Sequence, residues 1–312
     1  MKITNDIVIE KAKNSGFDLI GFTRADELDD EIRNLEKWLL NGFQAGMNYM
    51  ERNIEKRKDV KNVLPSAKSI ISLAVNYYTK HSYSGNKDYG KISRYAWGTD
   101  YHLIIWEMLE KLETELKLID SSFESISYVD TGPVMDKVWA VKSGLGWMGK
   151  HTNVINKELG SWIFLSSLIT NYEFEYSNII PDFCGTCTAC IDACPTGAIV
   201  DEYVVDSNKC IPYLTIENKG NIPVEFGNKF DNWLFGCDIC QDVCPWNIKF
   251  SVETRKDEFN PAGGNKEINL NEIITMDNEE FKKRFKRSPV NRAKLKGLKR
   301  NAGFLIDSLK NK

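Results

Sequence analysis

The sequence has no long apolar run and no recognisable leader. Within its 312 residues, no stretch of apolar side chains approaches the roughly 20 residues that a membrane span needs. The first residues, Met1-Lys2-Ile3-Thr4-Asn5-Asp6, lack the apolar segment and the small-residue cleavage site of a secretory signal. Composition shows no bias typical of disordered or collagen-like chains. We therefore expect a globular protein of the cytoplasm that has no contact with a membrane.

The sequence also has little net charge, only −3, but its charge is unevenly spread. Between Phe281 and Lys312 the only acidic residue is Asp307. Lysine and arginine recur through this segment, at Lys282, Lys283, Arg284, Lys286, Arg287, Arg292, Lys294, Lys296, Lys299, Arg300, Lys310 and Lys312. Such a run indicates either a solvated helix face or a surface for a polyanion such as RNA.

Residues 1–175 alternate between helix and strand patterns, which predicts a mixed domain of helices and sheet. A helix is expected to begin at Thr4 or Asn5 and to end at Gly16, because these residues favour the two ends of a helix. Apolar spacing predicts two further helices, at 27–40 and 101–118. Strands are expected at 17–22, 69–75 and 161–165, and short helices at 278–286 and 291–309.

The eight cysteines are better explained as metal ligands than as disulfides, because thiols stay reduced in the cytoplasm. Cys184, Cys187, Cys190 and Cys194, followed by Pro195, form the spacing C-x2-C-x2-C-x3-C-P. This is the bacterial ferredoxin run for a four-iron cluster, in which the fourth cysteine ligates the other cluster.

A second run, Cys237-x2-Cys240-x3-Cys244-Pro245, is one cysteine short, and Cys210 can supply the missing ligand. One cluster would then be held by Cys184, Cys187, Cys190 and Cys244. The other would be held by Cys194, Cys210, Cys237 and Cys240. Zinc is the alternative, since paired C-x2-C units also suit it, but zinc explains neither the third cysteine of each run nor the two prolines.

Two other motifs look functional but are better explained otherwise. Gly144-Leu145-Gly146-Trp147-Met148-Gly149 fits G-x-G-x-x-G, yet it follows an expected helix that starts near Pro133, and a strand-like segment comes after it. A dinucleotide site needs the reverse order. Asp100-Tyr101-His102 matches the start of a cobalamin-binding D-x-H-x-x-G motif, but Ile105 replaces the glycine. We expect His102 to cap or pack at a helix start.

Beyond the cysteines, several segments together resemble the epoxyqueuosine reductase family, from near the start of the chain to about residue 306. These segments are Asp18-Leu19-Ile20-Gly21-Phe22, Glu55-Lys56-Arg57, Leu64-Pro65-Ser66-Ala67-Lys68-Ser69-Ile70, Arg94 to His102, Val129-Asp130-Thr131-Gly132-Pro133, Ala140 to Thr152, and Gly236 to Pro245. Few other families combine these motifs with the full cysteine pattern.

The resemblance implies an α+β fold in three parts. A nitroreductase-like cobalamin-binding core, shared with reductive dehalogenases, would span 1–175. A ferredoxin-like module with two [4Fe-4S] clusters would span 176–250, and a short, basic, truncated HEAT-like helical segment 251–312. A ferredoxin- or flavodoxin-type donor would reduce cobalamin through the clusters, and the enzyme, as a monomer, would convert epoxyqueuosine in tRNA anticodons to queuosine.

The family's motifs also assign roles to individual residues. Asp130 matches the proton donor, which must stay protonated beside the substrate; otherwise Asp130 only caps the helix near Pro133. Arg57 matches a cobalamin contact; otherwise it pairs with Glu55 at the surface. The cobalamin-facing positions implied are Arg57, Ser93, Asp130, Lys150, His151, Val154, Leu165 and Asp238. Asp238 could instead cap a turn. The tRNA contacts expected are Lys296, Lys299 and Arg300.

The chain departs from the family pattern at two places. Many relatives continue into an array of HEAT-like helices, of which 291–309 corresponds to about the first. Some relatives carry cysteine where this chain has Ser93, so a role of that cysteine cannot be general to the chemistry if this protein is active. Two other functions remain open on the sequence: a cobalamin-dependent reductase of a small molecule, similar to reductive dehalogenases, and an electron carrier without catalysis.

Overall fold

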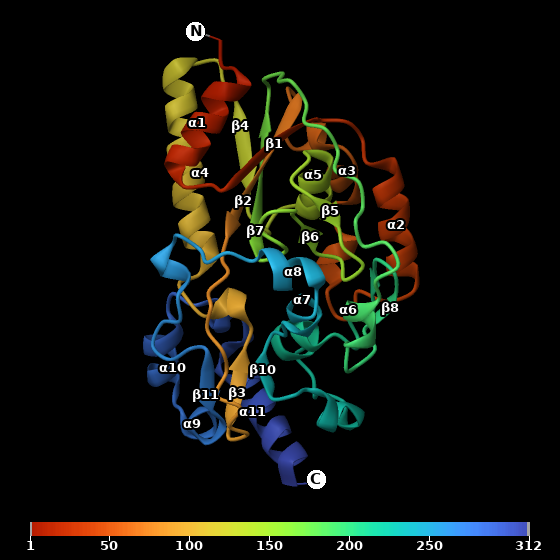
Figure 1. Cartoon of the computed structure of the whole chain (residues 1–312), viewed down its shortest axis with the longest axis vertical. Coiled ribbons are helices and arrows are strands. Elements are labelled where there is room, and N and C mark those ends of the chain that lie inside the picture. The colour runs from red at the N-terminus through yellow and green to blue at the C-terminus, as the bar shows by residue number, and fades with distance from the viewer. Residues whose placement is uncertain (1, 311–312) are drawn as a thin grey trace. The chain divides into compact units, whose positions relative to one another are not determined.

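A computed structural model describes residues 2–310 of the chain (Figure 1). They form two units that alternate along the sequence. Unit 1 contains the residues up to Gly42, then Tyr49–Asn76 and His102–Cys187, and unit 2 contains Phe43–Asn48, Tyr77–Tyr101 and the chain from Thr188 onward. The expected three-part division into 1–175, 176–250 and 251–312 stays a prediction.

Unit 1 is built on a four-stranded sheet in which every neighbouring pair is antiparallel, in the order β1-β2-β7-β4. Its strands are β1 (Leu19–Arg24), β2 (Ser69–Asn76), β4 (Ser125–Tyr128) and β7 (Ile163–Thr170). Every residue of β2 is buried, as expected for a central strand covered on both faces. The strand expected at 161–165 begins later and runs to Thr170, because it pairs with the whole of β2.

Two helices, α1 (Asn5–Ser15) and α4 (Tyr101–Ile119), lie side by side along the sheet of unit 1 (Figure 1). The Lys111 ammonium donates to the Asn14 carbonyl at 2.9 Å, and Lys11 pairs with Glu115 at 3.4 Å. The ends expected for α1 are confirmed: Thr4 is the N-cap and Gly16 closes the helix with φ 103°. Within residues 2–310, no helix is both long and apolar enough to cross a bilayer.

The opposite face of the sheet is covered by α2 (Asp29–Leu40), α3 (Ile54–Lys58) and α5 (Asp136–Lys142) (Figure 1). Ile32 of α2 and Trp139 of α5 pack on Ile70 of β2 and Ile169 of β7, together with Ile54 of α3. The short strands β5 (Trp147–Met148) and β6 (Val154–Ile155) follow α5, and the turns η1 (Asn48–Glu51) and η2 (Val60–Asn62) flank α3.

The Gly144–Gly149 run therefore lies after a helix and leads into β5, not between a strand and a helix. This order confirms that the run is not a dinucleotide-binding loop. The expected helix start near Pro133 was wrong, because α5 begins only at Asp136 and residues 129–135 form an irregular loop.

Unit 2 has a small sheet in the order β10-β3-β11, with β3 (Tyr89–Ile92) in the centre. The edge strands of this sheet are β10 (Trp233–Phe235) and β11 (Glu267–Asn269). A separate two-stranded sheet is formed by β8 (Ile199–Asp201) and β9 (Val204–Val205). The helices of unit 2 are α6 (Ala189–Asp192), α7 (Ile239–Asp242), α8 (Pro245–Phe250), α9 (Leu270–Thr275), α10 (Asn278–Phe285) and α11 (Lys294–Lys310). Short 3-10 or π-helical segments are η3 (Arg94–Ala96), η4 (Tyr213–Glu217), η5 (Val224–Lys229), η6 (Asp257–Phe259) and η7 (Pro289–Ala293).

The core of unit 2 joins segments that are distant in sequence. Fully buried Trp97, Trp233 and Phe235 contact the apolar faces of α10 and α11, including Phe285 and Leu298. The two C-terminal helices expected from the sequence are present, although the second is preceded by the turn η7 and begins at Lys294. The basic C-terminal segment is therefore a packed part of unit 2, with its charges distributed over the outer faces of the helices.

Candidate functional site

The Asp130 side chain is exposed in unit 1, on the loop between β4 and α5. Its backbone has φ 56°, in the left-handed region that a non-glycine residue adopts only at a cost. Asp130 does not cap α5: the N-cap is Met135, which makes no side-chain capping bond. The alternative role as a helix cap is therefore wrong, and the strained backbone is typical of a functional position.

A second carboxylate, which the sequence analysis missed, lies under this loop. Asp136 is the first residue of α5, and Ser167 of β7 donates to its Oδ1 at 2.5 Å. The backbone N–H of Asp130 also donates to this carboxylate. The residue keeps some exposure, but its carboxyl group is buried, and this burial, reinforced by the charge of Asp130, raises its pKa to about 7.

Arg57 places a positive charge near the carboxyl group of Asp136. Its side chain is buried in unit 1, not paired with Glu55 at the surface, and burial lowers its pKa. The guanidinium lies 3.4 Å from the Arg52 carbonyl and 3.5 Å from the Tyr49 carbonyl, and it interacts electrostatically with Asp136. The structure thus brings two residues assigned by resemblance, Arg57 and Asp130, to the same buried carboxylate.

Lys150 and His151 lie in the tight turn between β5 and β6, and both are buried. The Lys150 ammonium donates to the Gly185 carbonyl at 2.7 Å, so its charge is directed at the backbone. Burial, and then the charge of Lys137, lowers the pKa of His151 to about 4, so the ring is neutral at physiological pH. Its Nδ1 accepts from the Asn153 N–H at 3.2 Å, which leaves the proton on Nε2.

That Nε2 atom is buried and has no hydrogen-bond partner among residues 2–310. A buried donor of this kind costs free energy, so it fits a group that accepts a hydrogen bond. Beside the turn, Val154 belongs to an apolar cluster with Ala140 and Leu145, against which Leu165 packs. An orphaned donor in this turn fits a ligand that carries hydrogen-bond acceptors, as cobalamin does through its amide groups.

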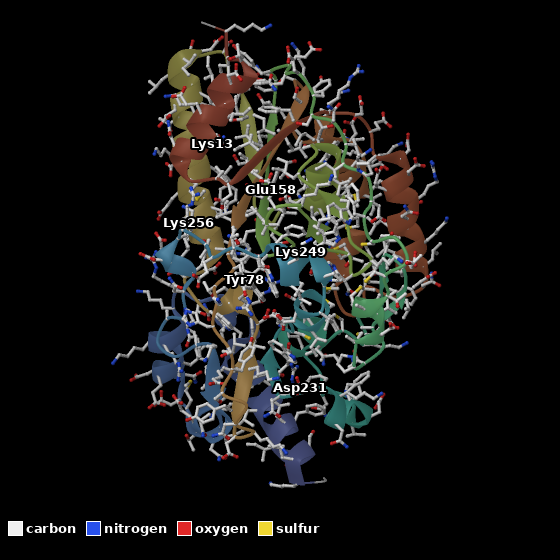
Figure 2. All side chains as sticks on the ribbon, in the orientation of Figure 1. Lys13, Tyr78, Glu158, Asp231, Lys249 and Lys256 are labelled. Carbon is white, nitrogen blue, oxygen red and sulfur yellow. The ribbon has the colours of Figure 1, made fainter. Side chains whose placement is uncertain are left out.

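Ser93 and Asp238 contact each other in unit 2. The Ser93 hydroxyl donates to one oxygen of the Asp238 carboxylate, and the Arg94 N–H donates to the other at 2.8 Å. The Arg94 guanidinium stacks on Tyr78, labelled in Figure 2, at 4.9 Å, and on Trp97 at 4.6 Å. These contacts anchor the loop of Cys237 and Cys240 to the rest of unit 2; a cobalamin contact of Ser93 or Asp238 stays a prediction.

All eight cysteines lie within the described chain, and none forms a disulfide. In unit 2 the thiol of Cys240 is surrounded by other thiols: burial, followed by the charges of Cys210, Cys190 and Cys194, raises its pKa. Burial raises the pKa of Cys237, again with Cys240 and Cys210 among its neighbours. Buried thiols gathered in this way are poor nucleophiles but good ligands, because a bound metal removes their protons.

The cluster ligands predicted as one set, Cys194, Cys210, Cys237 and Cys240, are thus neighbours in the fold. The Ala198 N–H donates to the Cys194 sulfur at 3.2 Å, a contact typical of cluster cysteines, where it tunes the reduction potential. Of the other set, Cys190 and Cys244 are both buried in unit 2. The donor chemistry therefore fits iron–sulfur clusters.

Replacing Cys240 by alanine should remove one cluster and leave about four irons per chain instead of about eight. The remaining thiols of its set cannot complete the four-ligand site, and every other cysteine is already assigned. Iron and acid-labile sulfide contents after anaerobic reconstitution measure this loss. Ser251→Ala, in the same unit, is the control and should keep the full iron content. Zinc in place of iron, or an undiminished iron content in Cys240→Ala, would contradict the assignment.

The three residues predicted to bind tRNA lie on α11 but are not equivalent. Lys296 is exposed and Lys299 is partly exposed. Arg300 is half-buried, and its guanidinium donates to the carbonyls of Leu214, Asn218 and Gly220. Arg300 therefore joins α11 to η4 and to the residues that follow it, and this use of its donors gives it a structural role.

An antiparallel α/β unit with a strained aspartate loop, together with an eight-cysteine module, defines the class of the protein: a two-cluster iron–sulfur oxidoreductase. Two family models match the chain. A 4Fe-4S double cluster binding domain matches residues 183–247. The model described as epoxyqueuosine reductase QueG, DUF1730, matches residues 57–131.

Curated relatives are similar over almost the whole chain. An epoxyqueuosine reductase of Cellulophaga algicola is 45% identical over 301 residues, covering 96% of this chain and 97% of its own. That of Atelocyanobacterium thalassa is 43% identical over 306 residues, covering 97% and 98%. The chain therefore belongs to the epoxyqueuosine reductase family.

Solved structures agree with this membership. An epoxyqueuosine reductase crystallised with an epoxyqueuosine-modified tRNA-Tyr stem loop has a TM-score of 0.91 and 36% identity, covering 98% of this chain and 81% of its own. A Bacillus subtilis epoxyqueuosine reductase, whose catalytic aspartate loop is swung out of the active site, has a TM-score of 0.91 and 35% identity, covering 98% and 82%. The family, the α+β fold class and the two-cluster module predicted from the sequence are confirmed.

Proposed function

We propose that this protein reduces epoxyqueuosine to queuosine at the wobble position of tRNA anticodons. The observation that carries the proposal is the full-length similarity to epoxyqueuosine reductases at 43–45% identity. The two-cluster module at residues 183–247 supports it, because removal of the epoxide oxygen as water consumes two electrons as well as two protons. The clusters deliver those electrons one at a time, from a ferredoxin- or flavodoxin-type donor.

Cobalamin, when bound, supplies the low-potential metal chemistry that breaks the carbon–oxygen bond of the epoxide. In this proposal it is held by Arg57, Lys150 and His151 and by the apolar side chains of Val154 and Leu165. The orphaned Nε2 donor of His151 supports this assignment. The remaining cobalamin-facing positions in this proposal are Ser93, Asp130 and Asp238.

Asp130 gives a proton to the departing epoxide oxygen, because an alkoxide is a poor leaving group. Its position on an exposed loop of unit 1 supports this role, since the side chain can reach a substrate that enters from solvent. The protein acts as a monomer in the cytoplasm, where its tRNA substrate is found.

Lys296 and Lys299 bind phosphates of the tRNA, since they carry charge at exposed and partly exposed positions of α11. Replacing both by glutamine should weaken tRNA binding and reduce the slope of log K against log salt by about 0.7–0.9 for each lost phosphate contact. Binding titrations at several salt concentrations measure the slope.

The control for these variants is Lys13→Gln, an exposed lysine of α1 that is labelled in Figure 2. This variant should leave both affinity and slope as in the wild type. Arg300 is not part of the test, because its substitution disturbs the contacts of α11 with three backbone carbonyls. A slope that stays unchanged in the double variant would exclude these two lysines from the tRNA surface.

Expression in a bacterium that lacks its own epoxyqueuosine reductase tests the proposed function. The tRNA of that strain accumulates epoxyqueuosine, and this protein should convert it to queuosine, as read by mass spectrometry of digested nucleosides. If epoxyqueuosine persists although the protein contains iron and binds cobalamin, the reductase acts on a small molecule instead. If no cobalamin binds, the protein is an electron carrier.

A further inference from the structure

The buried Asp136 carboxylate joins the Asp130 loop to the sheet. Ser167 of β7 donates its hydroxyl to Oδ1 at 2.5 Å, and the Asp130 backbone N–H donates to the same carboxylate. Arg57, from α3, supplies the nearby positive charge. The carboxylate thus receives one hydrogen bond from a central strand and one from the residue that presents the catalytic proton.

The loop that Asp136 contacts needs an external restraint. Asp130 has φ 56°, a conformation that costs free energy for a residue with a Cβ. Two residues on, Gly132 lies so close to Tyr128 that a Cβ would stand 1.9 Å from its ring. A strained, closely packed turn of this kind persists only where neighbouring contacts hold it.

We propose that Asp136 is a positioning residue, whose carboxylate holds the Asp130 backbone N–H and thereby fixes where the Asp130 side chain presents its proton. The inference rests on the proposed function for the role of Asp130, but not for the hydrogen bond itself. The ionised carboxylate is the stronger acceptor, because hydrogen bonds to charged groups are shorter and stronger than neutral ones.

The charged groups around Asp136 determine when it is ionised. The negative charge of Asp130 on the loop disfavours the ionised form of Asp136. Arg57 on α3 favours the ionised form by its positive charge, and Ser167 on β7 favours it by a hydrogen bond. Burial outweighs the two favourable contacts, and the resulting pKa of about 7 means that the restraint strengthens as pH rises through neutrality. The next residue of α5, Lys137, is directed away, to the Thr152 carbonyl and the Asn153 side chain.

Hydrogen exchange of the cofactor-loaded protein tests the inference, because it reads the Asp130 N–H without any substrate. Asp136→Ala, which removes the acceptor, should lower the protection of peptides covering residues 129–135 roughly tenfold. Asp136→Asn, which keeps the shape and a weaker acceptor, should lose less. Wild-type protection should rise from about pH 6 to about pH 8, and Asp136→Asn should remove this rise.

Two controls separate this restraint from general loosening. Asp120→Ala removes a carboxylate that binds Tyr172 and Ser122, and it should leave the 129–135 peptides unchanged. Asp136→Glu, which keeps the carboxylate, should recover part of the protection. The inference would be overturned by unchanged exchange in Asp136→Ala. It would also be overturned if the protection of the wild-type peptides did not rise as pH passes through about 7.

The turnover of the same variants links the restraint to the reaction. Asp136→Ala should lower kcat while leaving KM for tRNA near the wild-type value, since the acid is displaced but the RNA contacts are not. If the protein does not reduce epoxyqueuosine at all, the proposed function fails while the exchange result still stands. If reduction proceeds normally with unprotected loop peptides, the inference fails and the function stands.

Discussion

Replacing Asp130 by asparagine should lower the rate of epoxyqueuosine reduction by about 10²–10⁴-fold, the range that a positioned general acid contributes. The amide has nearly the same size and keeps a polar tip, but it cannot give a proton to the departing oxygen. The substitution should therefore affect kcat and leave tRNA affinity and the cluster content unchanged. Because Asp130 is exposed on its loop, the folded structure should tolerate the change.

Single-turnover kinetics, with the protein fully reduced before tRNA is added, isolates this step from electron delivery. Asp26→Asn is the matched control, since Asp26 is an exposed carboxylate of the same unit that pairs with exposed Arg24. A rate in Asp130→Asn within a few-fold of the control would show that the proton comes from another group. The family membership would be unaffected by that result.

Replacing Asp136 by asparagine should stabilise the folded protein at pH 8, on the order of 2–4 kcal/mol. The pKa of this carboxyl is raised from 3.8 to about 7 in the folded state, so between these values the folded protein binds more protons than the unfolded chain. Its stability therefore falls as pH rises through this window. Above pH 7 the full cost of the buried charge is present, and the neutral amide avoids it.

The measurement is the apparent Tm of wild type and Asp136→Asn, at equal cofactor content, at pH 5 and at pH 8. A gain of roughly 3–6 °C is expected at pH 8, and it should shrink towards pH 5, where the wild-type carboxyl is already protonated in the folded state. A gain independent of pH would mean that packing, not charge, distinguishes the two side chains. A loss of stability at pH 8 would mean that the hydrogen bonds of the carboxylate outweigh its burial.

The parts of the fold that depend on local chemistry were predictable. Thr4 and Gly16 delimit α1 because a hydroxyl caps the N-terminus and glycine adopts a positive φ, and both effects act within a few residues. The two-cluster module was predictable for the same reason, since spacing and the following prolines fix how thiolates approach a cluster. The division of the eight cysteines into two ligand sets stays a prediction, and the neighbours of Cys240 include Cys210 and Cys194 of its own set but also Cys190 of the other.

What depends on tertiary contacts was not predictable from the sequence. Asp136 looks like an ordinary acid in the first turn of a helix, and only the packing of α5 on β7 buries it. Arg300 looks like one more member of a basic run, although Leu214 of η4 and Asn218 after it provide carbonyls that bind it. Pro133 marks a plausible helix start, yet α5 begins only at Asp136, after a turn in which Gly132 packs closely against Tyr128.

Anaerobic reaction of the reconstituted, chemically reduced protein with epoxyqueuosine-containing tRNA tests the central claim most directly, with nucleosides analysed by mass spectrometry. We expect the modified nucleoside to lose the mass of one oxygen atom only when cobalamin, both clusters and Asp130 are all present, and the free epoxide nucleoside to react far more slowly than the tRNA. Conversion that proceeds without cobalamin, or tRNA that stays unreacted with every component in place, would contradict the account.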